Sequence, residues 1–277
     1  MLELYGEALT GRATKAAASV QVSGTQSIQR AVGVLRFIAS SGPAPRLGEI
    51  AAGVGIDLGT AHRIVNGLCY QGLVQRQAQT RRYQLGRLVY ELGLAAAPDF
   101  PLRDLCRPAL DRLAQRTGDS IFLLARSGND LVCLERVEGG FPIQTHTLDV
   151  GARRPLGAGA GGLALLMALP PAEIDSVLSA NAARYLAWER LSVGRLKELI
   201  TMGQPSGVAV NDGELLSGVA AIGRAFRTAR AIGGTREPSL AAISIASIGS
   251  RLQGARRAEL TRLLLGEVQA LERLLTS

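Results

Sequence analysis

Apolar residues recur every three to four positions in three short segments of the first third of the chain. The first segment begins at Ser27, a suitable N-cap, and the second stops at Gly55. The third runs from about Leu58 to Gln71, and Gly72 behind it readily adopts the left-handed conformation of a helix end. The predicted inner faces are Ile28, Ala31, Val32, Leu35 and Ile38, then Leu47, Ile50, Ala51 and Val54, then Ala61, Ile64, Val65 and Leu68. This spacing predicts three amphipathic helices, the last two joined by a tight turn.

A hairpin is predicted directly after the third helix, with strands at Leu73–Arg76 and Arg82–Leu85 joined by Gln77–Arg81. Helix pairs alone also occur in proteins that never touch DNA, but a basic hairpin behind them makes a winged helix-turn-helix. The third helix is predicted to present a polar face to base edges and phosphates: Gly59, Thr60, His62, Arg63 and Asn66. The hairpin is predicted to contact the DNA backbone or the minor groove through Arg76, Arg81 and Arg82.

A linker follows the hairpin. The segment from Arg87 to about Ala97 reads as a helix with a seam of Leu88, Leu92 and Ala95, and two prolines, Pro98 and Pro101, mark a boundary behind it. We therefore expect a mobile N-terminal arm at 1–22, a DNA-binding domain at 23–86, a linker helix at 87–100 and a second domain at 101–277.

The second domain mixes helical and alternating patterns. It opens with a predicted helix, Leu102–Thr117, that turns Leu105, Leu110 and Leu113 inward. Strands are predicted at Ser120–Arg126, Asp130–Val137, Pro142–Leu148, Gly207–Val210, Val219–Phe226 and Leu240–Ser247. Helices are predicted at Gly162–Leu169, Pro171–Ala180, Val193–Met202 and Ala255–Leu275, the last burying Leu260, Leu263, Leu264, Val268, Leu271 and Leu275. The whole chain is thus predicted to be α+β, with a mostly antiparallel sheet flanked by helices in this domain.

Charge supports the DNA-binding interpretation of the first domain. Residues 1–97 hold ten Lys and Arg against five Asp and Glu, whereas residues 98–277 hold twenty-one against eighteen. The smaller part is the more basic per residue, as binding to phosphate requires. Only Lys15 and Lys197 are lysines; arginine favours phosphate and guanine contacts, but a GC-rich genome would give the same bias.

Composition argues against several other classes of protein. The chain has three widely spaced cysteines without a C-x-x-C pair, so neither a disulfide framework nor a zinc site is expected, and no cofactor is expected either. The N-terminus lacks the apolar core of a secretory signal, which favours a cytoplasmic protein. Eighteen uncharged residues separate Arg154 from Glu173, but four glycines and three prolines interrupt them, so we expect no membrane span.

Catalytic chemistry has little support in the sequence. The two histidines are His62, already placed on the DNA-facing helix, and His146, which could point into a pocket or into solvent. No Gly-x-Ser-x-Gly elbow is present. The glycine run Gly157–Gly162 formally matches a dinucleotide fingerprint, but no buried parallel strand precedes it. Its bare backbone amides, followed by a helix N-terminus, suit a small anion better.

Several motifs resemble one family of bacterial regulators. They are Leu47-Gly48-Glu49-Ile50-Ala51, Thr60-Ala61-His62-Arg63-Ile64, Gly72-Leu73-Val74 and Arg82-Tyr83-Gln84-Leu85-Gly86. This string resembles the DNA-binding domain of the IclR family, and the resemblance runs from about Ser23 to the C-terminus. Gly48 and Gly59 depart from the Ser or Thr usual there, which bears on helix capping and phosphate contact. The resemblance implies a GAF-like fold for the second domain.

The same resemblance implies an effector pocket. Ala160 and Gly161 match loop residues that touch the ligand, and Asn211 stands where Asp is usual. Ala221 matches a position that can be Cys, while Ser244 matches the first of two serines whose second is replaced by Ala246. These replacements predict a less polar and roomier site, and hence an effector larger or more apolar than a two-carbon acid, with a carboxylate.

The sequence therefore predicts a transcriptional regulator that binds double-stranded operator DNA as a homodimer or a dimer of dimers and responds to a small organic acid. An enzyme acting on a small carboxylic acid, with the helical domain used for protein interaction, is the alternative. An architectural DNA-binding protein is disfavoured, because it gives the second domain no role. The loop Arg227–Pro238 is expected to be a solvated surface loop, with a cover over the effector as the alternative.

Overall fold

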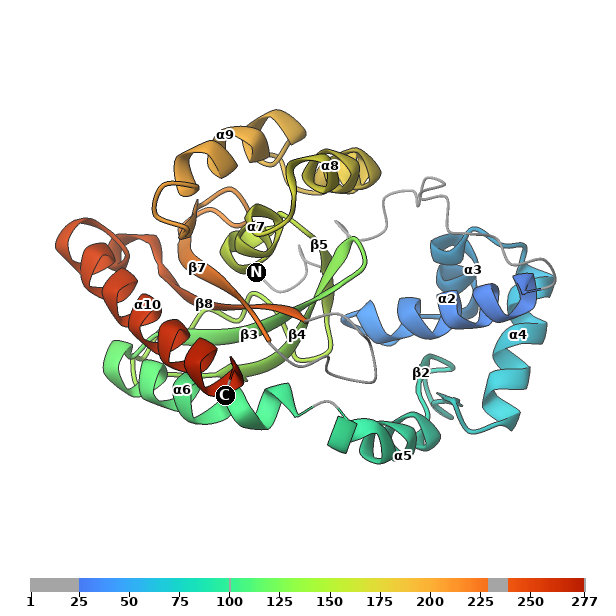
Figure 1. Ribbon diagram of the computed structural model, residues 1–277. Helices are drawn as coiled ribbons and strands as arrows, with labels where there is room; N and C mark the ends of the chain where they lie inside the picture. Colours follow the sequence, from blue (N-terminus) through green and yellow to red (C-terminus); the bar gives the residue numbers. More distant parts are fainter. Residues whose placement is uncertain (1–24, 100, 229–238, 277) are drawn as a thin grey trace. The chain divides into compact units, whose positions relative to one another are not determined.

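The computed structural model describes residues 25–99, 101–228 and 239–276 of the 277-residue chain. The chain divides into two compact units, one ending at Pro98 and the other beginning at Asp99 (Figure 1). Each has its own hydrophobic core. The expected arm at 1–22 and residues 229–238 of the Arg227–Pro238 loop lie outside the described residues.

The first unit is a three-helix core with a small hairpin. Its elements are α2 (Gln26–Ser40), α3 (Leu47–Val54), α4 (Leu58–Tyr70), β1 (Val74–Arg76), β2 (Tyr83–Leu85), α5 (Arg87–Ala96) and the short 3₁₀ helix η1 (Ala97–Asp99). Val34, Ile50 and Val65 are fully buried where the three helices meet, and Tyr83 closes the core from the hairpin. This is the predicted arrangement, with element ends shifted by one or two residues.

Two expectations for this unit are wrong. Helix α2 begins at Gln26 with Thr25 as N-cap, so Ser27 lies inside the helix. Its buried face is centred on Val34 and Ile38, which turns Ile28 to its edge at 64% exposure and leaves Val32 exposed too. Along α5, Leu92 is exposed and Leu88 is half-buried, and none of the described α5 residues is fully buried.

The second unit is built on one six-stranded sheet with the order β5-β4-β3-β8-β7-β6, in which every described pairing is antiparallel (Figure 1). The strands are β3 (Ser120–Ser127), β4 (Asp130–Val137), β5 (Arg153–Pro155), β6 (Ala209–Asp212), β7 (Val219–Arg227) and β8 (Leu240–Ile248). The helices are α6 (Leu102–Thr117), α7 (Gly159–Met167), α8 (Pro171–Tyr185), α9 (Val193–Gly203), η2 (Gly249–Arg251) and α10 (Gly254–Thr276). The predicted α+β class is confirmed.

Helices cover both faces of this sheet, because successive strand residues point to opposite sides. On β3, Ile121 and Leu123 pack against α6 and α10, while Phe122 and Leu124 belong to the core under α7, α8 and α9. Figure 1 shows α7 lying against the face opposite α6 and α10. The space between α7 and the sheet is where the cavity described below lies.

Two details of the second unit correct the sequence prediction. Pro142–Leu148 is not a strand; Arg153–Pro155 pairs with β4 instead. Pro142 lacks an N–H for a ladder, and the side-chain amide of Gln144 donates to the carbonyl oxygens of Gly118, Gly139 and Phe141, which holds this segment as a loop. On α6, Leu105 was expected to face the core but is exposed, and the adjacent Cys106 is buried there instead.

Candidate functional site

The exposed face of α4 carries a row of polar side chains. Gly59, His62, Arg63 and Asn66 are exposed and Thr60 is half-buried. Arg63 Nη2 donates to Thr60 Oγ1 at 3.4 Å, and Asn66 Nδ2 lies 3.2 Å from His62 Nε2. These contacts join residues three and four positions apart, so they pre-order the side chains along one face of the helix. The predicted groove-reading residues therefore share one surface.

The two glycines that replace family Ser or Thr do not leave the helices uncapped. Asp57 is the N-cap of α4, and its Oδ1 accepts from Thr60 N at 2.8 Å. Hydrogen bonds from the Thr60 side chain and backbone hold the pKa of Asp57 below its usual value, because they favour the carboxylate. At the start of α3, Arg46 N donates to Glu49 Oε2 at 2.6 Å. Carboxylates thus replace the missing hydroxyls.

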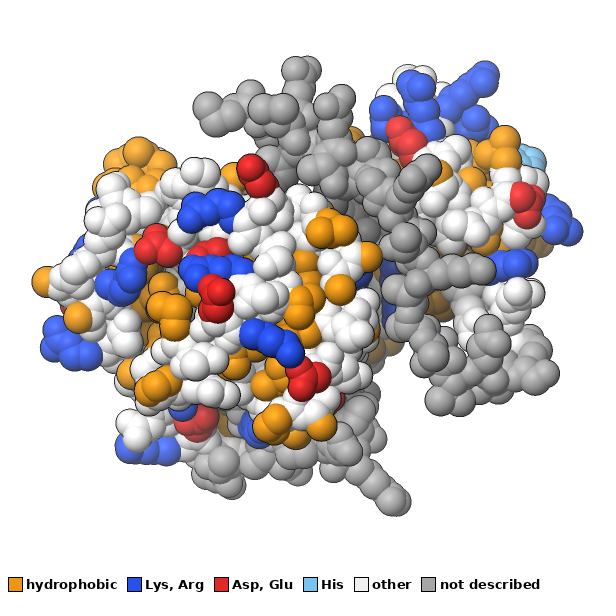
Figure 2. Space-filling model, turned by 90° about the horizontal axis from the view of Figure 1, so that it is seen from above, with side chains coloured by type: hydrophobic (Ala, Val, Ile, Leu, Met, Phe, Trp, Pro, Cys, Tyr) orange, Lys and Arg blue, Asp and Glu red, His pale blue; other side chains and the backbone are white. Residues whose placement is uncertain are grey.

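The three wing arginines have different surroundings. Arg82 Nη1 donates to Ala44 O at 2.6 Å and lies 3.8 Å from Glu49 Oε2, so its guanidinium holds the hairpin against the loop before α3. Arg76 lies 5.8 Å from the centre of the Tyr83 ring and is exposed. Arg81 is exposed at the tip of the hairpin, in a left-handed backbone conformation with φ 56°. Figure 2 shows Lys and Arg side chains gathered on the unit that carries these elements, with fewer acidic ones.

The hairpin is also fixed to the helices by a close backbone contact. Gly86 N donates to Leu73 O at 2.8 Å and Leu88 N donates to Gly72 O at 3.2 Å. A Cβ added to Gly86 would lie 2.1 Å from Gly72 O. Only glycine fits where the end of the wing crosses the end of α4.

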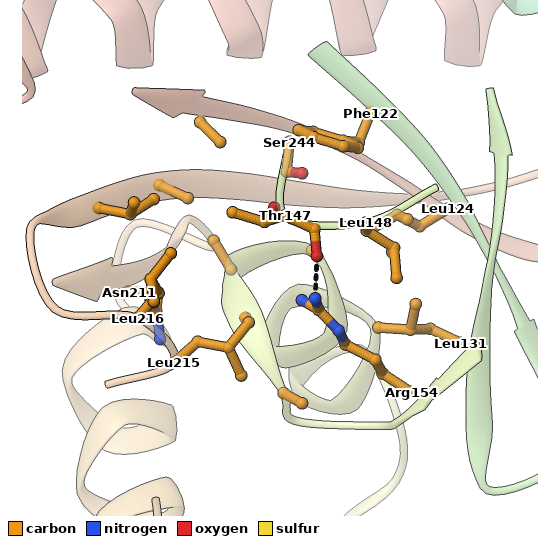
Figure 3. A pocket seen from close by; sticks show the side chains of 17 residues that line it. Phe122, Leu124, Leu131, Thr147, Leu148, Arg154, Asn211, Leu215, Leu216 and Ser244 are labelled. Carbon is orange, nitrogen blue, oxygen red and sulfur yellow. Dashed lines mark hydrogen bonds between the residues drawn. The ribbon is translucent and has the colours of Figure 1, made fainter. Parts of the chain in front are cut away.

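A cavity lies between α7 and the sheet of the second unit (Figure 3). All six residues that the resemblance implied for an effector pocket line it. The described lining residues are Phe122, Leu124, Leu131, Thr147, Leu148, Arg154, Ala158, Gly159, Ala160, Gly161, Asn211, Leu215, Leu216, Val219, Ala221, Ser244 and Ala246. Most of this surface is apolar, with a few polar groups at fixed points, as in sites for small organic ligands.

The glycine run brings the start of α7 close to the sheet. Gly157 and Gly159 have φ of 94° and 77°, and α7 begins at Gly159. A Cβ on Gly161 would lie 2.1 Å from Leu124 Cδ1, and one on Gly223 of β7 would lie 2.6 Å from Ala160 O. The first-turn amides of α7, which have no acceptors within the helix, therefore lie at the cavity wall. The antiparallel β5 before this run excludes a dinucleotide-binding βαβ unit there.

Arg154 was not predicted from the sequence. Its partner across the β4–β5 ladder is the buried Leu131, so both side chains lie on the α7 side of the sheet. Figure 3 shows the guanidinium extending into the cavity, where it donates to the backbone oxygen of Thr147. The adjacent Arg153 instead binds Asp130. The misplaced strand at 142–148 concealed this alternation, which otherwise would have separated the two arginines.

The β6–β7 loop closes another side of the cavity with Leu215 and Leu216. Between Asn211 and these leucines, Glu214 is buried, and its carboxylate accepts from Arg195 Nη2 at 2.7 Å and from Asp212 N at 2.6 Å. Arg195 belongs to α9, so this ion pair joins the loop to that helix.

The cavity is small. Its volume is about 40 Å³, although alanines occupy 221 and 246. Figure 3 shows Arg154 and the two loop leucines extending towards the cavity. A cavity that holds a benzene ring measures about 150 Å³, so an aromatic acid requires this cavity to widen.

His146, Cys106 and Cys133 lie outside the cavity lining and the exposed α4 face. His146 is exposed beside Glu138 and does not line the cavity. Burial raises the pKa of both Cys106 and Cys133 to about 12, which keeps these thiols protonated at neutral pH. Among residues 25–99, 101–228 and 239–276, no group of three His, Cys, Asp or Glu could hold a metal ion. Within the same ranges no helix is long and apolar enough to cross a membrane.

Comparison with known families decides the identity of the fold. The family described as bacterial transcriptional regulator IclR C-terminal matches residues 95–273, and the IclR helix-turn-helix domain matches residues 27–78. The chain belongs to the IclR family. An IclR-family member is a transcriptional regulator with a DNA-binding helix-turn-helix and an effector domain, which describes the two units of this chain.

Individual relatives agree. The regulator KipR of Bacillus subtilis is 28% identical over 189 residues, which cover 65% of this chain and 72% of KipR. The glycerol operon regulatory protein of Streptomyces griseus is 27% identical over 197 residues, covering 71% and 77%. The repressor AllR of Klebsiella pneumoniae is 24% identical over 230 residues, covering 83% and 82%. These IclR relatives are regulators of transcription.

Solved structures show the same fold. An IclR regulator from Silicibacter sp. TM1040 superposes with a TM-score of 0.76 at 19% identity, covering 91% of this chain and 96% of that one. An IclR homolog from Microbacterium hydrocarbonoxydans, solved in complex with 4-hydroxybenzoate, superposes with a TM-score of 0.67 at 23% identity, covering 90% and 99%.

Proposed function

We propose that this IclR regulator binds operator DNA through α4 and the wing, and that a small organic acid in the α7 cavity changes that binding. The observation that carries the proposal is the convergence of six residues from α7, β6, β7 and β8 on one cavity. They meet there although they are up to 86 positions apart, between Ala160 and Ala246. In this scheme residues 23–86 bind DNA, 87–100 link the domains and 101–277 bind the effector, in the cytoplasm.

The DNA-binding half of the proposal assigns two kinds of contact. Gly59, Thr60, His62, Arg63 and Asn66 would lie in the major groove, where the α4 face fits. The wing residues Arg76, Arg81 and Arg82 would contact the flanking backbone. Arg82 is the weakest donor of the three, because Ala44 O and Glu49 already occupy its guanidinium.

A homodimer or a dimer of dimers would present two α4 helices to half-sites about 34 Å apart, one turn of DNA. Effector binding changes operator affinity only if the acid prefers one arrangement of the assembly.

An organic acid suits the chemistry of the cavity, because anionic and apolar parts of a ligand both find partners there. The α7 N-terminus and its free amides favour negative charge. The surrounding Leu, Phe and Ala side chains favour a hydrocarbon body. The structural relative that holds 4-hydroxybenzoate is an IclR protein with an aromatic acid, which makes aromatic acids the first candidates.

An electrophoretic mobility shift tests both halves. The probe is the DNA between this gene and its neighbour, titrated with protein at moderate salt and then with benzoate, 4-hydroxybenzoate and branched aliphatic acids. A shifted band whose midpoint one acid changes supports the proposal. Operator binding that no acid changes refutes the effector half, and a folded protein that shifts no promoter fragment at low salt refutes the DNA half.

A further inference from the structure

We propose that Arg154 binds the carboxylate of the effector, and that it does so by exchanging the backbone oxygen of Thr147 for the oxygens of the ligand. The effector class is then a monocarboxylate with an apolar body. This inference rests on the proposed function, because it takes the α7 cavity to be the effector site.

The charge of the cavity wall favours an anionic ligand. Among the described residues that line the cavity, Arg154 carries the charge, and the remaining polar side chains are Thr147, Asn211 and Ser244. Its guanidinium extends into surroundings formed largely by leucines, where the dielectric is low and a nearby anion is strongly favoured (Figure 3). The start of α7 adds a partial positive charge to the same space.

One acceptor of Arg154 is the backbone oxygen of Thr147. Arg154 Nη2 donates to this neutral carbonyl oxygen, and a guanidinium presents its donors as a planar fork. A carboxylate offers two charged oxygens to the same fork, and charge-assisted hydrogen bonds are about twice as strong as neutral ones. A bound acid therefore displaces the carbonyl from Arg154.

The apolar walls define the rest of the ligand. Phe122 and Leu124 of β3, Leu131 of β4 and Leu148 of the β4–β5 connection surround the space beside Arg154. A second carboxylate or several hydroxyls on the ligand would be buried against these side chains without hydrogen-bond partners, which is unfavourable. Aromatic and branched monocarboxylates satisfy both parts, whereas dicarboxylates and polyols do not.

Release of Thr147 provides a response elsewhere in the unit. Thr147 and the adjacent Leu148 belong to residues 138–152, a connection held outside the strand ladders by side-chain contacts. Asp149 of this connection pairs with Arg136 at 2.8 Å on the exposed side. When Arg154 turns to the ligand, the backbone at Thr147 loses its donor. The connection then moves, and the cavity of about 40 Å³ gains the space that an acid needs.

Calorimetric titration of the full chain at pH 7.5 tests the assignment. The probes are benzoate, phenylacetate and 3-methylbutanoate, each paired with its neutral amide, and succinate as a dicarboxylate. We expect wild-type protein to prefer at least one monocarboxylate over its amide by about tenfold to a hundredfold. Arg154→Met should lose that preference, and Arg154→Lys should keep part of it, since it keeps the charge without the fork. The matched control, Arg153→Met, removes the neighbouring arginine that faces Asp130 and should bind the acid as wild type does.

The failures are distinguishable. If no monocarboxylate binds wild type, the proposed organic-acid function is wrong and the role of Arg154 falls with it. If an acid binds wild type and both Arg154 variants equally, the function stands and the assignment to Arg154 is wrong. If succinate binds wild type more tightly than the monocarboxylates, the predicted effector class is wrong.

Hydrogen exchange with benzoate or the best-binding acid tests the exchange of acceptors. Faster exchange at residues 147–150 in wild type, but not in Arg154→Met, supports it. Acid binding without any change in this segment refutes it.

Discussion

Arg195 Nη2 lies 2.7 Å from Glu214 Oε1, and this ion pair fixes the β6–β7 loop of the cavity to helix α9. The Glu214 side chain is 2% exposed and the Arg195 side chain 38%, so the carboxylate of the loop is buried whereas the arginine of the helix is accessible to solvent. The position of Leu215 and Leu216 therefore depends on a helix that does not itself line the cavity.

Arg195→Ala should lower the free energy of unfolding of the second unit, because it leaves a buried carboxylate short of a donor. We expect about 1–2 kcal/mol, since water reaches the arginine and screens the pair. Denaturation in urea measures it. Lys197→Ala on the same helix removes an exposed pair with Asp175 and should change stability by less than about 0.5 kcal/mol. Equal losses in the two variants would contradict the special role of the buried pair.

Arg63→Ala and Arg76→Ala should weaken operator binding in different ways. A base-reading arginine contributes about 1–3 kcal/mol of discrimination, so Arg63→Ala should bind the operator and unrelated DNA with more similar affinity. Arg76→Ala should weaken binding to both DNAs alike and reduce the salt slope by about one. Fluorescence anisotropy over a salt series separates these effects. Arg36→Ala, which removes an exposed arginine of α2, is the control for net charge. If Arg63→Ala discriminates between operator and unrelated DNA as wild type does, the placement of α4 in the major groove is wrong.

Gly86→Ala should destabilise the first unit by about 1–3 kcal/mol, because the new Cβ would meet the backbone oxygen of Gly72. Operator affinity should fall as well, since the wing must shift. Gly93 on α5 has open space around it, so Gly93→Ala should be neutral or stabilising by up to about 1 kcal/mol. Thermal unfolding of both variants, followed by DNA titration, makes the comparison. Wild-type stability in Gly86→Ala would show that the wing does not pack against Gly72 in solution.

Glu135 should make the second unit sensitive to acid. Burial alone raises the pKa of this carboxyl, but hydrogen bonds from Arg103 and from the Arg136 backbone hold the pKa below its usual 4.5. A depressed folded pKa gives stability that is complete above the unfolded value and is lost as the pH falls through the folded value. Stability should therefore decline from about pH 4.5 downwards, and Glu135→Gln should reduce that decline. Urea denaturation at pH 7, 4 and 3 measures the free energy of unfolding of each protein. The control is Glu259→Gln, which changes an exposed carboxyl and should decline as wild type does. If Glu135→Gln loses stability as steeply as these two proteins, the assignment to Glu135 is wrong.

The winged helix-turn-helix could be predicted because its determinants are local. Helical spacing, glycines at left-handed positions such as Gly55 and Gly72, and a short basic hairpin all lie within forty residues. The same method misplaced Ile28, because periodicity gives the hydrophobic stripe but not the angle at which neighbouring helices cover it. It also misread Leu105, where the smaller Cys106 fills the core instead.

The cavity could be predicted only in part. Family motifs placed six residues that line it, but they did not give its size or Arg154. The direction of Arg154 depends on pairing with Leu131, and that pairing was hidden because Gln144 holds residues 142–148 out of the sheet. Ion pairs such as Arg195 with Glu214 join segments nineteen residues apart and have no signature in sequence spacing.

The contact of Gly223 with Ala160 bears on how such regulators acquire new effectors. Because the start of α7 rests on bare backbone of β7, helix and strand form one stiff floor, and substitutions there would disturb the fold. Part of the remaining wall comes from the β4–β5 connection and the β6–β7 loop, which hold few ladder bonds. Mutations accumulate in such loops with little effect on folding. Over evolutionary time, ligand preference can therefore diverge between duplicated genes while the scaffold and the DNA-reading surface stay the same.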